Sequence, residues 1–423
     1  MGTGLAGAAL MLASCTPSTA PRATGGDDKT GTVRVWLFDE PNRVPKEKVV
    51  ADAITEFTAL HRGVTVEVSY IAVQTRSEKF KGAFNDPASA PDVVEYGNTD
   101  LPEYVAAGGL ADLTADVDVW AERKDLGTNL RATATVDGKL YGIPWYVGVR
   151  ALYYRTDLFT ELGLAPPTSR TDLVAAATTI RSAKPDLYGI AVGGRYTFAA
   201  LPFVWDAGGD LATRQGDRYL AAINSVESRA GVKAYTDLMV PAICPPQQCA
   251  DLTGGRTVEI FASGKAGMAI LGNFNRAAVD AGGAKGKYAV VPLPGARPGS
   301  IAPAFAGGNN LGIMKSGKRR GLAMEFLRLL GGAKYQKRMY EAMGNLPTLT
   351  STRTELAGRD PFLRPFLDTM SAGTRFVPLD PGWGKIDAQQ IVPTMLQKIV
   401  TGKATVQQAT DEAAAAMDAA FGR

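Results

Sequence analysis

Histidine and cysteine are scarce in this sequence, and their scarcity limits the chemistry that it can perform. Among 423 residues there are one histidine, His61, and three cysteines. A Ser-His-Asp triad or a histidine-based zinc site would have to use His61, which we place at the end of a predicted helix beside Arg62. A lone surface histidine is weak support for either role. We therefore expect no metal site and no cofactor.

Long hydrophobic runs and a strong charge imbalance are also missing. No apolar run reaches the ~20 residues that a helix needs to cross a bilayer. The formal net charge is +4, and no predicted helix gathers Lys and Arg on one face, so nucleic acid is not an expected partner. Hydrophobic residues make up 45% and charged residues 21% of the chain, a balance typical of globular proteins. At this length two domains are expected.

The amino terminus contains a signal-like segment. A short apolar stretch, residues 5–13, runs into Leu12-Ala13-Ser14-Cys15. This pattern resembles the lipobox of bacterial lipoproteins, whose cysteine is acylated and becomes the first mature residue. We predict a signal over residues 1–15 with Cys15 as the lipid acceptor, although the first four residues lack a basic side chain. The alternative is an ordinary buried start with a chance cysteine.

Residues 16–32 are rich in Thr, Pro, Gly and Asp and contain almost no large apolar side chain. Such a composition does not bury enough surface to order itself, so this segment is predicted to be a flexible tether. With the anchor, it places the folded part outside the cytoplasm, at the outer face of the cell membrane. The other two cysteines, Cys244 and Cys249, stand in C-P-P-Q-Q-C. Export to an oxidising compartment predicts a disulfide between them, and their spacing differs from the C-x-x-C of redox and zinc sites.

The first part of the folded chain predicts a parallel sheet. Residues 33–38 and 64–70 have the patterns of strands, and the amphipathic segment 46–62 between them has that of a helix. This β-α-β order implies a right-handed crossover and an α/β fold. Ligands of open α/β sheets bind at the carboxyl ends of the strands. Asp39 and Glu40 follow the first strand, and Asn98 follows a short third strand at 92–94.

The stretch 139–159 is predicted to join the two halves of the chain. A turn at Asp137-Gly138 precedes it, three aromatic residues surround Pro144, and a strand at 151–154 follows. Tyr and Trp combine a flat apolar face with a polar tip, so they suit a sugar ring whose hydroxyls are bonded at the edge. Further on, we predict helices at 171–183, capped by Thr171, and at 405–421, where Thr405 and Gln408 form a capping box.

Four motifs resemble those of a known family: P-D-V-V-E-Y-G-N at 91–98, D-G-K-L-Y-G-I-P-W-Y-V-G-V-R-A-L-Y-Y-R-T-D-L-F at 137–159, F-A-S-G-K-A-G-M-A-I-L-G-N-F at 261–274 and K-R-R-G-L-A-M-E-F-L-R-L-L at 318–330. Their order and spacing resemble the extracellular solute-binding proteins of carbohydrate ABC importers, the group that includes maltose-binding protein. The W-L-F-D and P-W-Y-V-G-V-R segments resemble actinobacterial importers for amino sugars and β-linked disaccharides.

The resemblance implies an α/β periplasmic-binding-protein fold, in which two lobes close over a central ligand cleft by hinge bending. It implies hinge crossings near 149–151, 305–310 and 346–347. The amino-terminal lobe would comprise residues 33–149 plus 306–346, and the carboxy-terminal lobe residues 150–305 plus 347–423. The function implied is a non-enzymatic, monomeric lipoprotein that captures a mono- or oligosaccharide and delivers it to the permease subunits of an ABC transporter.

By position in these motifs, ten residues are predicted to bind the ligand. Aromatic side chains would stack on sugar rings, whereas carboxylates and amides would fix the hydroxyls. Many similar sequences have an acidic residue near Gly148, and this chain has none there. Trp36 and Trp120 are predicted to be packing residues instead. The ten candidates are Asp39, Glu40, Asn98, Trp145, Tyr146, Arg150, Trp205, Asn273, Phe274 and Trp383.

Three other functions remain open at this point. A secreted glycoside hydrolase needs two carboxylates facing each other roughly 5–9 Å apart, and Asp39 with Glu40 are sequence neighbours that do not meet this need. An iron-binding protein of the same fold would use Tyr153 and Tyr154 as a pair of ligands, but successive residues of a strand point to opposite faces. A lipoprotein scaffold without a small ligand would have its cavity filled by side chains.

Overall fold

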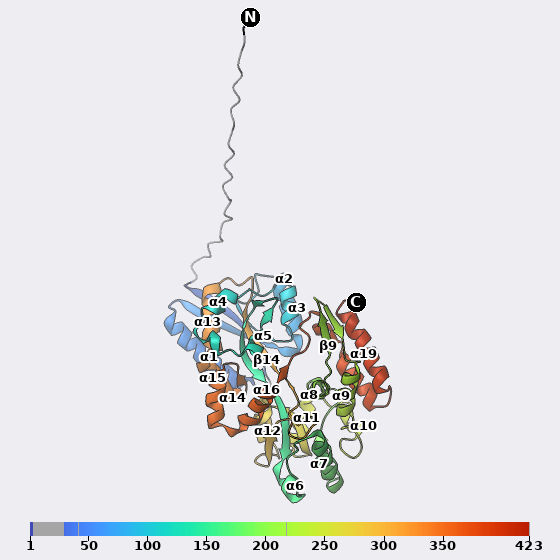
Figure 1. The fold of residues 1–423 in the computed structure, drawn as a ribbon. Helices are drawn as coiled ribbons and strands as arrows, with labels where there is room; N and C mark the ends of the chain where they lie inside the picture. Colours follow the sequence, from blue (N-terminus) through green and yellow to red (C-terminus); the bar gives the residue numbers. More distant parts are fainter. Residues whose placement is uncertain (3–28, 41, 217, 423) are drawn as a thin grey trace.

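The computed structural model describes residues 1–2, 29–40, 42–216 and 218–422. The predicted signal, with Cys15, and most of the predicted tether lie outside these residues. The described body consists of two α/β lobes, with the earliest helices in the upper lobe and α6 to α12 in the lower one (Figure 1). Within the described ranges, no helix combines the length and apolar character needed to cross a membrane.

The first lobe is built on a six-stranded sheet with the order β15-β6-β14-β3-β1-β2. β1 pairs in parallel with β2 and with β3, and α1 connects β1 to β2, as the β-α-β pattern predicts. β14 runs antiparallel to β3 and β6. The strands are β1 Gly31–Asp39, β2 Val64–Ala72, β3 Val93–Gly97, β6 Ile143–Gly148, β14 Gly307–Ile313 and β15 Leu346–Pro347.

Helices cover this first sheet because its strands are apolar on the inward faces. The alternating residues Val33, Val35 and Leu37 of β1 are fully buried, and Phe57 of α1 packs edge-on against Phe326 of α13 with ring centroids 5.2 Å apart. The helices of this lobe are α1 Arg43–Leu60, α2 Arg76–Asn85, α3 Leu101–Ala106, α4 Thr114–Asp118, α5 Thr128–Ala132, α13 Arg320–Gly331 and α14 Ala333–Met343.

The second lobe is built on a four-stranded sheet with the order β12-β7-β11-β8. β11 pairs antiparallel with β7 and parallel with β8. Its strands are β7 Arg150–Arg155, β8 Tyr188–Ala191, β11 Ala266–Gly272 and β12 Tyr288–Val291. The surrounding helices are α6 Thr156–Glu161, α7 Arg170–Ala183, α8 Thr197–Asp206, α9 Val226–Thr236, α10 Pro246–Cys249, α11 Gly254–Ala262, α12 Arg276–Asp280, α16 Arg364–Ala372, α17 Gly382–Ala388, α18 Ile391–Val400 and α19 Val406–Ala420.

The chain passes between the two sheets where strands follow one another directly. β6 belongs to the first sheet and β7 to the second, and the single residue Val149 separates them. Ala306 likewise stands between β13 (Ala304–Phe305) and β14, and β15 leads into α15 (Thr350–Arg359). Three small two-stranded sheets complete the fold: β4 Thr135–Val136 with β5 Lys139–Leu140, β9 Ala212–Gln215 with β10 Arg218–Ala221, and β13 with β16 Thr374–Arg375.

Two details of the predicted helices differ in the structure. The hydroxyl of Ser169, not Thr171, caps α7 by accepting a 3.1 Å hydrogen bond from the Asp172 N–H, because Ser169 has the extended backbone of a cap residue. Val174 of α7, expected to face inward, is 37% exposed. The predicted capping box of α19 is confirmed, with the Gln408 N–H donating to the Thr405 hydroxyl and the Gln408 side chain accepting from the Thr405 N–H.

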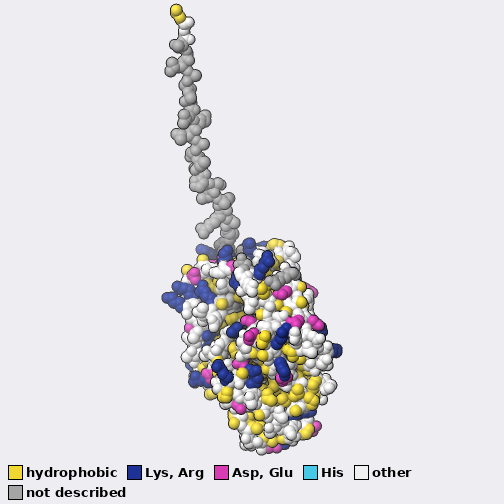
Figure 2. Space-filling view, turned by 45° about the vertical axis from the view of Figure 1, so that its right-hand side comes forward, with side chains coloured by type: hydrophobic (Ala, Val, Ile, Leu, Met, Phe, Trp, Pro, Cys, Tyr) yellow, Lys and Arg dark blue, Asp and Glu magenta, His cyan; other side chains and the backbone are white. Residues whose placement is uncertain are grey.

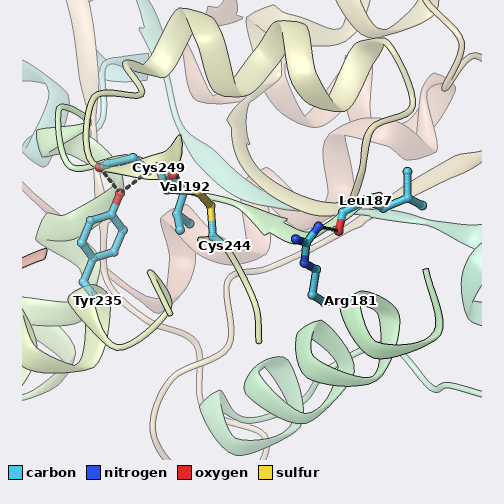
Figure 3. The surroundings of a disulfide bond; sticks show 7 residues. Arg181, Leu187, Val192, Tyr235, Cys244 and Cys249 are labelled. Carbon is cyan, nitrogen blue, oxygen red and sulfur yellow. Dashed lines mark hydrogen bonds between the residues drawn. A yellow bond between two sulfur atoms is a disulfide. The ribbon is translucent and has the colours of Figure 1, made fainter. Parts of the chain in front are cut away.

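The predicted disulfide is present in the second lobe. Cys244 and Cys249 are bonded and fully buried beside Val192 (Figure 3). The Tyr235 hydroxyl donates to the Gly193 carbonyl at 2.8 Å and accepts from its N–H at 3.2 Å, and the Gly194 N–H donates to the Cys249 carbonyl. The disulfide therefore closes a short loop within the segment between α9 and α11, and the hydrogen bond from Gly194 fastens that segment to the chain beyond the carboxyl end of β8.

Tyr153 and Tyr154 do point away from each other, as the strand geometry predicts. The Tyr153 side chain is fully buried, and its hydroxyl donates to the Gly272 carbonyl at 2.9 Å. Tyr154 packs in a different apolar cluster, against Phe159 at a ring distance of 4.8 Å. These two phenols do not form a paired ligand set.

Candidate functional site

A cleft between the two lobes has a volume of about 720 Å³. Its lining comes from both lobes: from the carboxyl ends of β1, β3 and β6 on one side, and from the start of β7, α8, α12 and α17 on the other. This volume lies within the range of roughly 300–1,000 Å³ that is usual for small-molecule sites. The position agrees with the rule that ligands bind beyond the carboxyl ends of α/β strands.

The wall of the first lobe rests on a buried carboxylate, Glu95 of β3. One Glu95 oxygen accepts from the Phe38 N–H at 2.7 Å and from the Lys46 ammonium at 2.9 Å. The other accepts from the Tyr146 hydroxyl at 2.5 Å and from the Asn309 amide at 2.6 Å. Glu95 and Lys46 are fully buried, so the fold compensates the charge of each with the other.

This cluster fixes the side chains that reach the cleft. Tyr146, Asn309 and Glu40 line it, and the Tyr146 hydroxyl lies 3.0 Å from a Glu40 oxygen. Burial, together with the Glu95 and Glu40 carboxylates, holds the pKa of the Tyr146 hydroxyl well above its ordinary value. Tyr146 therefore keeps its proton, and the first lobe presents a preorganised set of donors and acceptors to a ligand.

A second polar group lies on the same wall, toward α17 of the other lobe. Arg76 donates two hydrogen bonds to Asp100, of 2.8 and 3.0 Å, which neutralise both charges in a bidentate pair. Asp387 of α17 also lines the cleft. Desolvation raises the pKa of Asp387; Arg76 opposes this effect and Asp100 adds to it, so the three charges lie near one another across the cleft.

Aromatic rings dominate the wall of the second lobe. Phe198 and Phe305 stack with their centroids 4.4 Å apart, and both line the cleft. Phe274 is 38% exposed there, and a Cβ added at Gly148 would lie 2.7 Å from its ring, so glycine is needed for this close approach. Trp383 of α17 completes the aromatic set. A flat apolar wall therefore faces a polar wall across the cleft.

Amide side chains join the segments that pass between the lobes. Asn273 accepts a 2.8 Å hydrogen bond from the Val149 N–H and donates one of 2.7 Å to the Gly344 carbonyl. The Asn98 amide donates to the Ala306 carbonyl at 3.0 Å. Asn98 and Asn273 thus use their polar groups to position the backbone between the lobes, a role that the sequence analysis did not consider.

Six of the ten residues predicted to bind the ligand line the cleft: Glu40, Asn98, Tyr146, Arg150, Phe274 and Trp383. Trp383 is only 3% exposed, but its indole N–H has no hydrogen-bond partner in the described part of the chain. This distinguishes it from the two other tryptophans that were predicted to stack on a sugar. Whether any of the six contacts a ligand stays a prediction.

The other four do not line the cleft. Trp145 is fully buried in the first lobe and its indole N–H donates to the Leu330 carbonyl at 3.2 Å, because alternation along β6 directs it away from Tyr146. Trp205 is 3% exposed, and its N–H donates to Asp210. Asp39 is exposed and pairs with Arg43 one helical turn later. Asn273 is fully buried between backbone segments, as described above.

Trp36 and Trp120, predicted to be packing residues, are confirmed as such. Trp36 packs edge-on against Phe80 with centroids 6.0 Å apart, and Trp120 is 7% exposed in the core of the first lobe.

Several cleft residues were missed by the sequence analysis: Arg76, Asp100, Phe198, Phe305, Asn309, Asn345 and Asp387. Asp100 lies in a loop that the strand prediction had already placed at the correct sheet edge. Phe198 and Phe305 come from segments 107 residues apart (305 minus 198), and no local pattern links them. Asp387 belongs to α17, which reaches the cleft only through the packing of the carboxy-terminal helices.

Comparison with known proteins places the chain in a family. Residues 41–337 match the family described as bacterial extracellular solute-binding protein. The diacetylchitobiose binding protein DasA of Streptomyces coelicolor is 28% identical over 96% of this chain and 94% of its own length. The galactooligosaccharide-binding protein of Bacillus subtilis is 26% identical over 97% of this chain and 94% of its length.

Solved structures show the same architecture. The sugar-binding protein MalE of Xanthomonas citri superposes with a TM-score of 0.79 at 24% identity, over 92% of this chain and 97% of that one. The GacH receptor of Streptomyces glaucescens, also solved in complex with acarbose, gives 0.79 at 20% identity, over 93% and 98%. These likenesses confirm the two-lobe fold. The chain therefore belongs to the bacterial extracellular solute-binding protein family, which confirms the resemblance that its four motifs predicted.

Proposed function

We propose that this protein is the substrate-binding lipoprotein of an ABC importer. In this proposal it captures a mono- or oligosaccharide, with an amino sugar or a β-linked disaccharide as the preferred ligand, and delivers it to a membrane permease. The observation on which the proposal rests is the composition of the two walls of the cleft. Fixed hydrogen-bonding groups around Tyr146 face a wall of aromatic rings that includes Phe198 and Phe274.

A sugar ring requires this combination of surfaces. Its faces of C–H groups pack on aromatic rings, and its equatorial hydroxyls need donors and acceptors at the edges. Because the polar groups of the first lobe are already held by Glu95 and Lys46, a ligand does not have to order them. The relatives described above support the ligand class: one is a diacetylchitobiose binding protein, which favours an amino sugar, and one is a galactooligosaccharide-binding protein.

Hinge closure is the proposed means of signalling to the permease. We assign residues 33–149 plus 306–346 to one lobe and 150–305 plus 347–423 to the other, with crossings near Val149, Ala306 and Leu346. Consecutive strands of different sheets at Val149 support the first crossing. A ligand that contacts both walls favours the closed state by the difference between its affinities for the two states. The permease would recognise the surface that closure creates.

The proposal also covers where the protein acts and in what form. It is expected to be a monomer, anchored outside the cytoplasm through Cys15 and the tether of residues 16–32. It is proposed not to be an enzyme, and two of the carboxylates that line the cleft are already engaged: Glu40 by Lys46 and Asp100 by Arg76. A hydrolase would need one carboxyl group free to donate a proton and another free to act as base or nucleophile.

Thermal-shift screening of mono- and disaccharides, including N-acetylated ones, tests the proposal. Ligand at 100 times its dissociation constant stabilises the folded state by about 2.7 kcal/mol, which raises the melting temperature measurably. The best ligand is then incubated with the protein and analysed for hydrolysis. Absence of any stabilising saccharide would refute the proposed function, and turnover would favour the hydrolase.

Trp383→Ala tests the aromatic wall. We expect it to lose most of the affinity for the best saccharide, since stacking area disappears from α17, whereas Trp383→Phe retains part of it. Trp120→Phe, a change in the core of the first lobe away from the cleft, is the matched control. Isothermal titration calorimetry measures affinity, and urea unfolding verifies the fold of each variant. Unchanged affinity in Trp383→Ala would remove this residue from the site.

A further inference from the structure

Arg150 is a cation of the cleft without a counterion in the described chain. Two arginines line the cleft, and Arg76 is neutralised by Asp100. Arg150, the first residue of β7, makes one side-chain hydrogen bond, from its Nε to the Tyr196 hydroxyl at 2.8 Å. Its two terminal nitrogens have no hydrogen-bond partner among the described residues, and no carboxylate lies within ion-pairing distance. Four N–H donors are therefore left over.

The guanidinium is nevertheless held in place. Its central carbon lies 5.4 Å from the ring centroid of Tyr196, 5.2 Å from that of Phe198 and 5.8 Å from that of Phe274. Tyr196 is itself fixed, because its hydroxyl donates to the Ile270 carbonyl at 3.1 Å. Aromatic faces attract a cation, but they do not satisfy its N–H groups. The fold thus orients the Arg150 guanidinium and leaves the N–H groups of its two terminal nitrogens available for a ligand.

A second unused donor lines the same cleft. The side-chain nitrogen of Asn345 is buried and has no hydrogen-bond partner, and Asn345 is 6% exposed overall. Asn273 bonds both Val149 and Gly344, the residues that precede Arg150 and Asn345. These two hydrogen bonds of Asn273 therefore place both unused donors, those of Arg150 and Asn345, at the hinge end of the cleft. A buried amide without a hydrogen-bond partner is unfavourable, so an acceptor supplied by a ligand stabilises the complex.

We propose that Arg150 and Asn345 form a subsite for the carboxylate of an acidic saccharide, such as a uronic acid linked to a second sugar. This inference rests on the proposed function and narrows its ligand class. The carboxylate would accept two parallel N–H bonds from the Arg150 fork, and the Asn345 amide would donate to a remaining lone pair. The second sugar would extend toward the polar wall at Tyr146.

A carboxylate fits better than the other acceptors that a sugar can offer. It is planar and matches the spacing of the guanidinium N–H groups, and its charge replaces the missing counterion in a partly desolvated site. A neutral hydroxyl or N-acetyl carbonyl satisfies one or two N–H groups and leaves the charge uncompensated. A phosphate is bulkier and tetrahedral, and the sugar phosphate in the experiment below tests it directly against the carboxylate.

The experiment compares ligands that differ at one carbon. Isothermal titration calorimetry is carried out with cellobiose and with glucuronosyl-β-1,4-glucose, in which one CH₂OH is oxidised to a carboxylate. A parallel pair is glucosyl-β-1,3-N-acetylglucosamine and glucuronosyl-β-1,3-N-acetylglucosamine. Glucose 6-phosphate and glucuronic acid compare the two kinds of anion. We expect the uronate of each pair to bind at least 10-fold more tightly than its neutral partner.

Variants test whether Arg150 and Asn345 cause the preference for the uronate over the neutral sugar. Arg150→Gln is expected to abolish the preference for the uronate, measured as the ratio of the two affinities within each pair of ligands, and Arg150→Lys to retain part of it. Asn345→Ala is expected to weaken uronate binding several-fold. Arg256→Gln removes the same charge from an exposed helix surface outside the cleft, so it controls for long-range attraction. Urea unfolding verifies that each variant is folded.

The outcomes separate the two proposals. Neutral sugars that bind as tightly as their uronates would overturn this inference and leave the proposed function standing. A uronate preference that survives in Arg150→Gln would overturn the assignment of the subsite, and tighter binding of the sugar phosphate would overturn the choice of carboxylate. If no saccharide of either kind binds, the proposed function fails and the inference fails with it.

Discussion

Glu95→Gln offers a direct test of the cluster that supports the polar wall. Each Glu95 oxygen accepts two donors: the Phe38 N–H and the Lys46 ammonium on one side, and the Tyr146 hydroxyl and the Asn309 amide on the other. Glutamine has a single carbonyl oxygen. Whichever way the glutamine amide is turned, its NH₂ group takes the place of one Glu95 oxygen and faces the two donors that this oxygen had accepted. Because a donor does not accept a hydrogen bond, these two hydrogen bonds are lost.

The magnitude follows from the burial of this group. Lys46 is fully buried, and after the substitution its remaining carboxylate partner is Glu40, 3.3 Å away and 27% exposed. Removing one member of a buried ion pair costs about 3–5 kcal/mol, because the other charge stays buried without full compensation. Domains are stable by about 5–15 kcal/mol in total. We therefore expect Glu95→Gln to reduce the free energy of unfolding by about 3–5 kcal/mol, a large part of the total.

Urea unfolding at pH 7, followed by circular dichroism, measures this change. Glu355→Gln is the matched control, because Glu355 pairs with Lys337 at the surface with 44% of its side chain exposed, and exposed pairs contribute about 0–1 kcal/mol. Adding Lys46→Met to Glu95→Gln removes the orphaned charge, so the double variant should lose less than the sum of the single losses. A Glu95→Gln protein within 1 kcal/mol of the parent would refute the reasoning.

Two further predictions concern other parts of the fold. Asn273→Ala removes both hydrogen bonds between the segments at Val149 and Gly344, so we expect a loss of about 1–3 kcal/mol in urea unfolding, and Asn273→Asp, which keeps the acceptor, should recover part of it. Asp157→Asn should cost about 0.5–1 kcal/mol at pH 7, because hydrogen bonds from Arg155 lower the pKa of Asp157 while solvent screens a side chain that is 39% exposed. This contribution is present above the ordinary value of 3.8 and is lost as the pH falls through the lowered pKa, so the two proteins should converge at pH values below that pKa. A difference that persists unchanged at low pH would contradict this explanation.

The sequence contains enough information for the fold and for part of the site. The alternating apolar pattern of β1 and β2 and the amphipathic α1 predict a parallel unit, because local burial follows from periodicity. Glu40 and Asn98 line the cleft for the same reason, since they follow directly from the ends of strands. Trp383 also lines the cleft, and flanking glycines and few apolar neighbours separate it from the core pattern. Contact of these residues with a ligand stays a prediction.

The errors concern residues whose direction depends on packing. Trp145 and Tyr146 are adjacent on β6, and alternation requires that one face the cleft and the other the core. The sequence does not specify which, because the answer depends on Glu95, 51 residues away, whose carboxylate holds the Tyr146 hydroxyl. The role of Asn273 is similarly non-local, since its partners are at Val149 and Gly344.

The cleft combines hydrogen-bonding groups that are already paired with donors that are still unused, and this combination suggests how a ligand could close the lobes. The polar wall is tied to a buried ion pair, so it presents fixed hydrogen-bonding groups before any ligand arrives. Across the surface, acidic and basic side chains are interspersed, with apolar side chains gathered on the lower part of the face in Figure 2. At the hinge end of the cleft, the unused donors of Arg150 and Asn345 stand beside the segments that pass between the lobes. A ligand that satisfies these donors while it contacts Tyr146 would join the two lobes at the end where they hinge, and would favour closure by the affinity that it gains there.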